Sequence, residues 1–316
     1  MSSAPRIVCF GYVNPGVVFL VDRYPAANTG AYVTAKRPFI GADCAMAAQV
    51  LARWGIEAHL IGNALGDDDL GRRTLTQLAE LGVRAHIALR DDLHTPDEVD
   101  ISDRAGTRTF FVEDAPAVWE SLIEADLEAI IGAAMLYVDW YVGPAAERAV
   151  AFARAHGVPV FLNVEYSLRH PDRYRPLVSQ ASYAQAPMSD VHVAQEDPRA
   201  IAEALQALGV EVAFVTRGKH GSLALDRTGL IEVPAPAVQV VDTQGAGAVY
   251  SAAAMYGLLA GWPIVQVVHF ATTAASLKCA QHGLLDAKVE TILAQASLSG
   301  AVIHSRWTLN SNWPSG

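Results

Sequence analysis

The chain has little cysteine and no long apolar run. Its 316 residues include only three cysteines, Cys9, Cys44 and Cys279, without any Cys-x-x-Cys spacing. Scattered thiols among apolar neighbours argue against both a disulfide framework and a zinc site. No basic-then-apolar segment precedes the strand pattern at residues 7–12, and no apolar run reaches membrane-spanning length. We therefore expect a cytoplasmic protein with no membrane partner.

The chain also has fewer basic than acidic residues. Lys and Arg number 23 against 33 Asp and Glu, which gives a formal net charge of -10. An acidic surface does not attract nucleic acid or anionic lipid, so neither is an expected partner, and any phosphate must be held by local amides and a few cations. Residues 11–16 lack the middle glycine of Gly-x-Gly-x-x-Gly, which disfavours a dinucleotide-binding oxidoreductase. A P-loop motif, Gly-x-x-x-x-Gly-Lys-Ser/Thr, is missing as well.

What the chain does have is a large apolar fraction arranged in alternating strand and helix patterns. At 52% hydrophobic residues it can bury a large core. Short apolar runs predict strands at 7–10, 59–61, 135–138, 158–162, 191–193 and 212–216. Apolar spacings of three and four predict helices at 44–55, 70–82, 122–131, 145–156 and 199–209. This alternation predicts an α/β fold with a mostly parallel central sheet flanked by helices.

Two stretches break the alternation. Residues 17–39 and 97–112, the second with a turn at Gly106, read as consecutive strands without helices between them. We expect them to form a small β-sheet lid that is inserted in the main unit. The sequence shows no low-complexity linker and no internal repeat, so residues 1–316 are expected to form a single domain.

The most informative segment is the turn at residues 242–248, Asp-Thr-Gln-Gly-Ala-Gly-Ala. It follows an apolar strand pattern at 238–241 and opens a helical run at 250–259. A helix N-terminus leaves backbone amides without intrahelical partners, and glycines let a phosphate approach them closely. The amides of Gly245, Ala246 and Gly247 are therefore predicted to hold a transferring phosphate, while Asp242 could cap the turn.

This turn resembles the Asp-Thr-x-Gly-Ala-Gly-Asp signature of the PfkB (ribokinase-like) carbohydrate kinases. Further matches follow in order from residue 7 to about 285: residues 11–16 resemble Gly-x-x-x-x-Asp, 61–71 resemble Gly-x-x-Gly-x-Asp-x-x-Gly, and 215–221 resemble Thr-x-Gly-x-x-Gly. The resemblance implies a ribokinase-like three-layer sandwich with ATP and Mg²⁺ as cofactors, and a monovalent cation such as K⁺ near Asp242. It also implies phosphorylation of a sugar or nucleoside hydroxyl and a homodimer formed through the lid.

The resemblance assigns roles to individual residues. The catalytic turn comprises Gly245, Ala246, Gly247 and Ala248. Substrate contacts fall on Asn14, Gly16, Gly41, Ala42, Asp43, Ala45, Met46, Arg108 and Asn163. The nucleotide side falls on Thr216, Gly218, Gly221 and Gly247, and metal-linked positions are Glu196 and Asp242.

Several of these positions depart from the family pattern. Ala248 stands where the family has the aspartate that takes the proton from the substrate hydroxyl, and Gly16 stands where an aspartate binds the sugar. The sugar-binding asparagine is replaced by Ala45, with Met46 beside it, and Asn163 begins an Asn-Val-Glu segment in place of Asp-x-Asn. A methyl group cannot accept a proton, and loss of such a base costs about 10²-fold to 10⁴-fold in rate.

Two functions follow from these departures. The first is an ATP-dependent carbohydrate kinase that is impaired as written. The alternative is a catalytically inactive PfkB-like protein that binds or senses a small metabolite, or a nucleoside kinase. Some motif residues also have purely structural interpretations: Gly218 and Gly221 fit a hairpin turn, and residues 67–69 fit a solvated helix entry better than a metal cluster.

Overall fold

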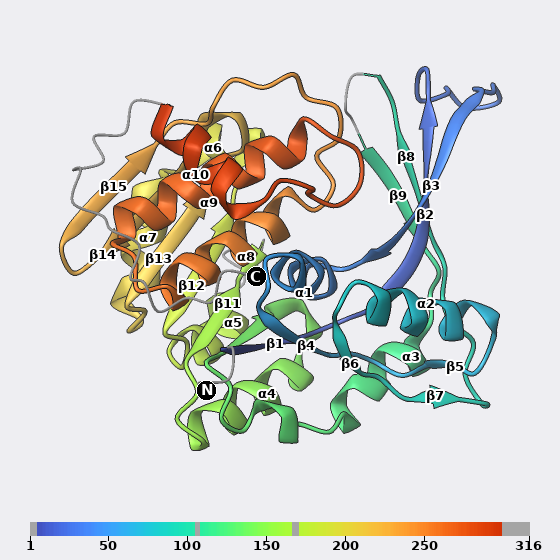
Figure 1. Cartoon of the computed structure of the whole chain (residues 1–316), viewed down its shortest axis with the longest axis horizontal. Coiled ribbons are helices and arrows are strands. Elements are labelled where there is room, and N and C mark those ends of the chain that lie inside the picture. The colour runs from blue at the N-terminus through green and yellow to red at the C-terminus, as the bar shows by residue number, and fades with distance from the viewer. Residues whose placement is uncertain (1–4, 105–107, 166–170, 299–316) are drawn as a thin grey trace.

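A nine-stranded sheet organises the molecule in the computed structural model, which describes residues 5–104, 108–165 and 171–298 (Figure 1). The strands are β1 (Arg6–Phe10), β4 (Glu57–Ile61), β6 (Arg84–His86), β10 (Met135–Asp139), β11 (Val160–Asn163), β12 (Tyr183–Pro187), β13 (Val212–Thr216), β14 (Ser222–Asp226) and β15 (Gly229–Val233). Their spatial order is β15-β14-β13-β12-β11-β10-β1-β4-β6. All neighbours from β13 to β6 pair in parallel, whereas β14 and β15 are antiparallel.

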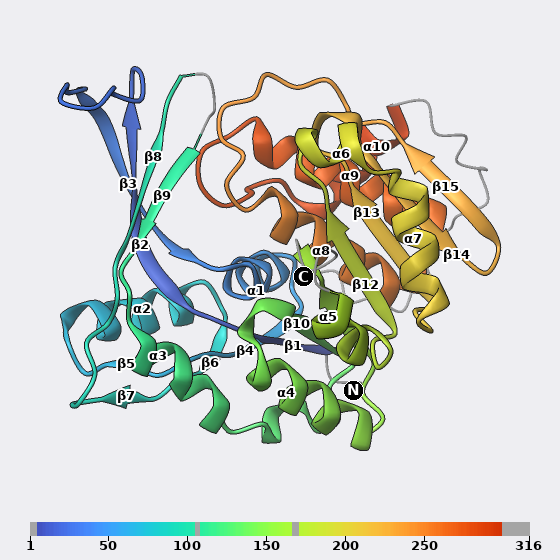
Figure 2. The ribbon, with the colours of Figure 1, turned by 180° about the vertical axis from the view of Figure 1, so that it is seen from behind.

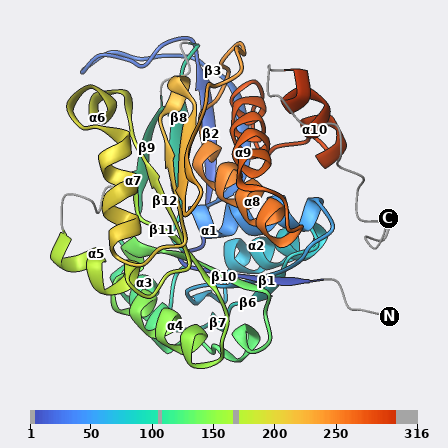
Figure 3. The same cartoon turned by 90° about the vertical axis from the view of Figure 1, so that its left-hand side faces the viewer.

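Helices cover both faces of this sheet, as the edge-on view shows (Figure 3). One face carries α1 (Asp43–Arg53), α2 (Asp69–Glu80), α8 (Ala246–Leu259), α9 (Ile264–Cys279) and α10 (Val289–Leu298). The other carries α4 (Pro144–Ala155), α5 (Pro171–Val178), α6 (Asp190–Gln195) and α7 (Pro198–Ala207). Successive β1 residues enter different cores, Ile7 and Cys9 on one side and Val8 and Phe10 on the other. This alternation of strand side chains makes the sheet the middle of three layers, as predicted.

A second sheet of four strands projects from the main sheet, and we call it the lid (Figures 1 and 2). It consists of β2 (Asn14–Val21), β3 (Val33–Gly41), β8 (Glu98–Ser102) and β9 (Arg108–Val112), in the order β3-β2-β8-β9. The predicted small sheet is therefore present, although β2 starts before residue 17 and β3 ends after residue 39. The expected turn at Gly106 lies outside the described residues.

Short elements complete the fold. They are β5 (Leu65–Gly66), which pairs with β7 (Leu89–Arg90), the helix α3 (Pro116–Glu120), and 3₁₀ turns at Ser121–Glu124, Glu128–Ile130, Trp140–Val142 and Gly218–His220. Across residues 5–104, 108–165 and 171–298, no helix combines the length and the apolar character needed to span a bilayer.

Three of the predicted elements are wrong. Residues 191–193 lie in α6 and form no strand, because Ser189 caps that helix: its hydroxyl accepts from the His192 amide, and the His192 side chain accepts from the Ser189 amide. Residues 238–241 form no strand either, since the Val241 amide donates to the Cys279 carbonyl at the end of α9 (2.7 Å). Residues 122–131 form two 3₁₀ turns in place of a helix.

Candidate active site

The phosphate-binding turn predicted from sequence is the start of α8. Gly245 is its N-cap in the left-handed region, with φ 73°, a conformation that glycine adopts without strain. The first helical bond runs from the Val249 amide to the Gly245 carbonyl (2.9 Å). The amides of Gly247 and Ala248, in the first turn, therefore have no intrahelical acceptor and are free for an anion, as expected of a helix N-terminus. The prediction for the Ala246 amide is wrong, because this amide donates to the Thr243 carbonyl (3.3 Å).

Helix α1 packs against this turn. A Cβ placed on Gly245 would lie 2.6 Å from the Met46 sulfur, so the thioether lies directly against the N-cap. Ala45 is fully buried in the core beneath the sheet. Of the two neighbouring positions predicted to face the substrate, it is Met46 that lies beside the turn.

Polar residues lie side by side on three neighbouring parallel strands below the turn, at the ends of β10 and β11 and within β12. Asp139 of β10 pairs in register with Asn163 of β11, which pairs with Gln185 of β12. The Gln185 amide donates to the Gly247 carbonyl (3.3 Å) and its oxygen accepts from the Ser251 hydroxyl. The carboxyl edge of the sheet is therefore joined directly to the first turn of α8, which is where α/β proteins of this kind bind ligands.

Three carboxyl groups, Asp43, Asp139 and Glu165, form what we call the inner acidic cluster. The Asn163 amide donates to Asp43 Oδ2 and to Asp139 Oδ1, both at 3.2 Å, and the Tyr137 hydroxyl donates to Asp139 Oδ1 (2.8 Å). Burial, and then the neighbouring Asp43 charge, raises the pKa of Asp139 to about 7 and that of Glu165 to about 9. Glu165 is consequently protonated at neutral pH and can donate a hydrogen bond.

A second group of carboxyls comes from the lid. Glu98 and Asp100 of β8 are buried, and we call them the lid acidic pair. Glu98 accepts from the Asn14 amide (2.7 Å), while Asp100 Oδ2 accepts from Gln244 Nε2 (2.5 Å) and Arg108 Nη1 (3.3 Å). Burial, and then the charge of Asp100, raises the pKa of Glu98 to about 7. Because Gln244 precedes Gly245, these bonds attach the lid to the phosphate-binding turn.

The predicted substrate positions Gly16, Gly41 and Ala42 shape the backbone of this region. A Cβ on Gly16 would lie 2.5 Å from the Glu98 carbonyl oxygen, and one on Gly41 would lie 2.7 Å from the Phe39 ring. Ala42 is the N-cap of α1 with φ 69°, a conformation that alanine rarely adopts. These residues therefore let β2, β3 and α1 approach one another, and their contact with a substrate stays a prediction.

Asp242 caps the turn, one of the two roles considered for it. Its Oδ1 accepts from the Gln244 amide (2.9 Å). Its Oδ2 accepts from Lys278 Nζ (3.2 Å) and from the Gly283 amide (3.3 Å). The carboxylate already has a cationic partner, so the arrangement does not fit the monovalent cation that the resemblance implied.

Three of the four predicted nucleotide residues occupy a hairpin between β13 and β14, and the fourth, Gly247, lies in α8. Thr216 ends β13, Gly218 starts the 3₁₀ turn, and Gly221 has φ 85°. A Cβ on Gly221 would lie 2.0 Å from the Val233 carbonyl oxygen, so the hairpin itself requires this glycine. A nucleotide role for these residues stays a prediction.

Glu196, the other predicted metal residue, is half-buried and follows the last turn of α6. Within the described ranges, no group of three or more His, Cys, Asp or Glu residues could hold a metal ion. This does not conflict with Mg²⁺ arriving with ATP, because Mg²⁺ is usually bound through one or two carboxylates together with the phosphates. The role of Glu196 stays a prediction.

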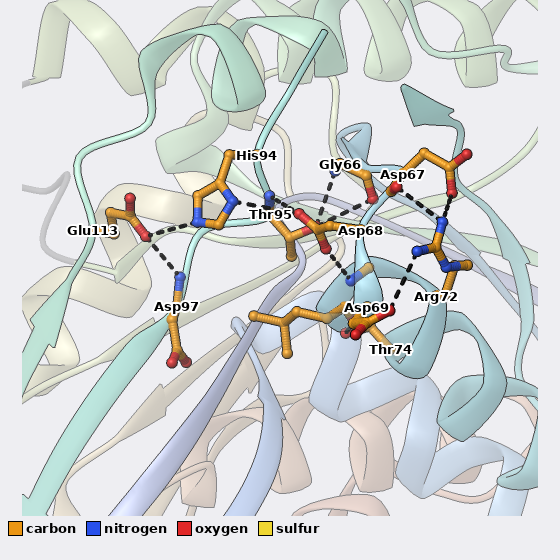
Figure 4. A network of polar contacts seen from close by, with 12 residues as sticks. Gly66, Asp67, Asp68, Asp69, Arg72, Thr74, His94, Thr95, Asp97 and Glu113 are labelled. Carbon is orange, nitrogen blue, oxygen red and sulfur yellow. Dashed lines mark hydrogen bonds and ion pairs between the residues drawn. The ribbon is translucent and has the colours of Figure 1, made fainter. Parts of the chain in front are cut away.

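The aspartates at 67–69 form a helix entry, as their interpretation from sequence favoured (Figure 4). Asp68 caps α2 by accepting from the Gly71 amide (2.8 Å), and its other oxygen accepts from the Thr95 amide (2.8 Å). Asp67 and Asp69 both pair with Arg72. Since Thr95 leads into β8, this network fixes the base of the lid.

The sequence-based prediction missed five groups that the fold brings into the site: Glu98, Asp100, Asp139, Glu165 and Lys278. Asp139 could have been found, because it directly follows a buried apolar run and so ends a predicted parallel strand. Glu98 and Asp100 alternate along a strand whose partners are distant in sequence, and no local pattern shows which face they occupy.

Comparison with known proteins identifies the family of the chain. The model of the "pfkB family carbohydrate kinase" family matches residues 4–292. A 5-dehydro-2-deoxygluconokinase of Geobacillus thermodenitrificans is 25% identical over 79% of this chain and 81% of its own length. The fructoselysine 6-kinase of Escherichia coli is 26% identical over 83% of this chain and 95% of its own length.

Solved structures share the fold. One from Agrobacterium tumefaciens, assigned as a ribokinase, has a TM-score of 0.83 at 20% identity and covers 94% of this chain and 98% of its own. An Escherichia coli protein assigned as ribokinase II, solved with ATP and Mg²⁺, has a TM-score of 0.77 at 17% identity over 92% of this chain and 99% of its own. Because the family model spans nearly all of the sequence, the chain belongs to the pfkB family of carbohydrate kinases.

Proposed function

We propose that this protein transfers a phosphoryl group from ATP to a hydroxyl of a small sugar or sugar-like molecule, at a rate limited by Ala248. The observation that carries the proposal is the pair of free amides at Gly247 and Ala248, in the first turn of α8, held over the polar carboxyl edge of a parallel sheet by Gln185. Phosphoryl transfer depends on positioning and on charge stabilisation, and preorganised amides supply both. Membership of the family supports the reaction class.

The polar groups of the site point to a substrate rich in hydrogen-bond donors. The inner acidic cluster and the lid acidic pair supply five carboxyl groups. The oxygens Asn14 Oδ1 and Asn163 Oδ1 are buried without a partner. Buried acceptors of this kind are normally satisfied, and the hydroxyl or ammonium groups of a bound substrate would satisfy them. A polyol sugar or an amine-bearing sugar fits this requirement better than a ligand with few donors.

In this mechanism the chain binds and orients, and ATP with Mg²⁺ supplies the phosphoryl group. The Gly247 and Ala248 amides hold the charge that develops on the phosphoryl oxygens, and Gln185 fixes that turn relative to the sheet. The Asp100–Gln244 contact places the lid over the same turn. At position 248 the side chain is a fully buried methyl, so no base is present where the family has one.

The proposal predicts that Ala248→Asp raises the rate of ATP-dependent phosphorylation by about 10²-fold to 10⁴-fold, because it restores a proton acceptor beside the phosphate turn. The measurement is ATP consumption with a panel of sugars, amino sugars and nucleosides. Ala248→Asn is the matched control: it has nearly the same shape and cannot accept the proton, so it should gain nothing. Equal rates for the two variants, or no turnover by the aspartate variant on any panel member, would count against the proposal.

A metabolite-binding protein without turnover is the second candidate. The observations that favour it are the buried methyl at Ala248 and the Met46 thioether against Gly245. In that case a metabolite should raise the melting temperature of the natural chain and of Ala248→Asp alike, with no ATP consumed by either. A rate gain restricted to the aspartate variant separates the two functions.

We further propose that the protein is a homodimer formed through the lid. The edge strand β9 exposes Phe110 (57%), Phe111 (53%) and Val112 (44%), and β3 exposes Val33 beside Tyr32. Consecutive exposed apolar residues on an edge strand favour association with a second copy. Phe111→Lys should shift the mass measured by light scattering from dimer to monomer, whereas Val265→Lys, at an equally exposed position on α9, should not. A cytoplasmic location stays a prediction.

A further inference from the structure

Lys278, in the last turn of α9, buries its ammonium group beneath the phosphate-binding turn. The residue is 3% exposed. Its Nζ donates to the Asp242 carbonyl (3.1 Å), to Asp242 Oδ2 (3.2 Å) and to the Gln281 carbonyl (3.3 Å). Three oxygens therefore surround one fixed positive charge, which satisfies all three donors of the ammonium.

Two carbonyl oxygens and one carboxylate are also the donor set that a hard cation takes in proteins. The family resemblance implied such a cation at Asp242. Here the oxygens are already bonded to an ammonium, and a second positive charge beside it would be repelled in a site with little water. We propose that Lys278 Nζ takes the place of the monovalent cation, so that the phosphate-binding turn holds its shape without K⁺.

The contacts of Asp242 show how this charge acts on the turn. Its Oδ2 is held by Lys278, which leaves Oδ1 to accept from the Gln244 amide (2.9 Å), directly before Gly245. The Val241 amide also donates to the carbonyl of Cys279, the neighbour of Lys278 (2.7 Å). Lys278 is thus a positioning residue: it acts on the phosphate turn through Asp242 and has no contact with the reacting atoms of its own.

Lys278 lies next to a cavity. A cavity of about 320 Å³ between α1, α8 and β3 is lined by Lys278 together with Gln244 and Gly245. Shortening the side chain would join the Asp242 oxygens to that cavity, which solvent ions can enter. The place now taken by the ammonium would then be open to a small cation.

The first measurement uses the natural protein. Its melting temperature should agree within about 1 °C in KCl, NaCl, CsCl and N-methylglucamine chloride at equal ionic strength, because no site is left for the cation. A rise specific to K⁺, or saturable binding of the K⁺ mimic Tl⁺ measured by NMR, would overturn the proposal. Neither readout needs turnover, so failure here is distinguishable from failure of the proposed kinase function.

The second measurement creates the missing site. Lys278→Ala should lower the melting temperature by about 5–10 °C, since one partner of a buried ion pair is removed. K⁺ or methylammonium should restore part of that loss, and N-methylglucamine, which is too large, should not. In the control Lys278→Met the thioether chain fills the space, so no cation should rescue it. If K⁺ raised the melting temperatures of both variants equally, the ion would act elsewhere and the proposal would be wrong. If Lys278→Ala does not fold, the melting temperatures of the natural protein in the four salts decide whether the proposal holds.

Discussion

At the residue scale, Gly16 departs from the family pattern at a point where the neighbouring strand β8 leaves no room for a side chain. Gly16 of β2 pairs in register with Glu98 of β8. A Cβ at position 16 would meet both the carbonyl oxygen (2.5 Å) and the Cβ (2.9 Å) of Glu98, and the ring of Phe39 (2.8 Å). A side chain at position 16, including the aspartate of the family pattern, would therefore collide with the β8 strand at Glu98 and with the Phe39 ring. Glycine at this position lets β2 and β8 approach closely.

Gly16→Asp, although it restores the family residue, is accordingly expected to lower the free energy of unfolding by about 2 kcal/mol or more, because overpacking displaces β8 backbone. Urea unfolding followed by circular dichroism measures the loss. Gly30→Asp is the control: a Cβ there meets nothing within 4 Å, so its effect should stay within about 0.5 kcal/mol. A Gly16→Asp variant as stable as the control would contradict the close approach of β2 and β8 at this position.

At the element scale, the side chain of Gln244 joins the lid to the turn that starts α8. Gln244 Nε2 donates to Asp100 Oδ2 (2.5 Å), and Arg108 donates to the same oxygen (3.3 Å). At its base the lid is held by the Asp68–Thr95 contact (Figure 4). Asp100, further along β8, contacts Gln244 just before α8. Docking of β8 and β9 against the start of α8 thus depends on the neutral Gln244 amide, which faces the Asp100 carboxylate.

Gln244→Glu should loosen that docking, because it replaces the donor by a like charge beside both Asp100 and Asp242. The expected result is at least several-fold faster amide hydrogen exchange in residues 98–112, with weaker binding of substrate. Exchange in α4 should be unchanged. The same substitution at the exposed Gln295 of α10 serves as control, and unaltered exchange in the lid of Gln244→Glu would exclude this contact as the docking point.

At the scale of the whole molecule, buried acids couple stability to pH. Glu165 has a pKa raised to about 9, and those of Glu98 and Asp139 are raised to about 7, in each case mainly by burial. Each folded-state pKa exceeds its unfolded value. The stability these groups contribute is therefore complete below the unfolded pKa and is lost as the pH rises through the folded one.

Between pH 7 and 9, the buried acids can be observed separately from the buried histidines in the pH dependence of stability. Burial lowers the pKa of His59, His86, His269 and His282, so these four histidines are neutral in the folded state throughout this window. Stability should then fall by up to about 1.4 kcal/mol per pH unit for Glu165 alone. Glu165→Gln mimics the protonated form and should flatten the slope of melting temperature against pH, whereas Glu203→Gln, on the surface of α7, should not. An unchanged slope in Glu165→Gln would contradict the raised pKa.

Much of the architecture could be predicted from local patterns. Continuous apolar runs predicted β1, β4, β10, β11 and β13, and the helical run at 250–259 predicted most of α8, because burial on both faces of a sheet and helical spacing both leave a signal within a few residues. The parallel strand β12 (Tyr183–Pro187) was not predicted. Where a cap decided the outcome, the pattern failed: the apolar residues 191–193 became a helix because Ser189 and His192 satisfy its first amides. Local hydrogen bonding there outweighed β propensity.

The sequence by itself determined the scaffold, the glycine turn at 245–247 and the absence of a base at position 248, because these depend on residues adjacent in the chain. Only the tertiary structure decided which acids gather at the candidate site and what holds Asp242. Glu98 lies 82 positions from Gly16, and Lys278 lies 36 positions from Asp242. Strand register and the packing of α9 on the turn bring these pairs together, and burial then sets their charge.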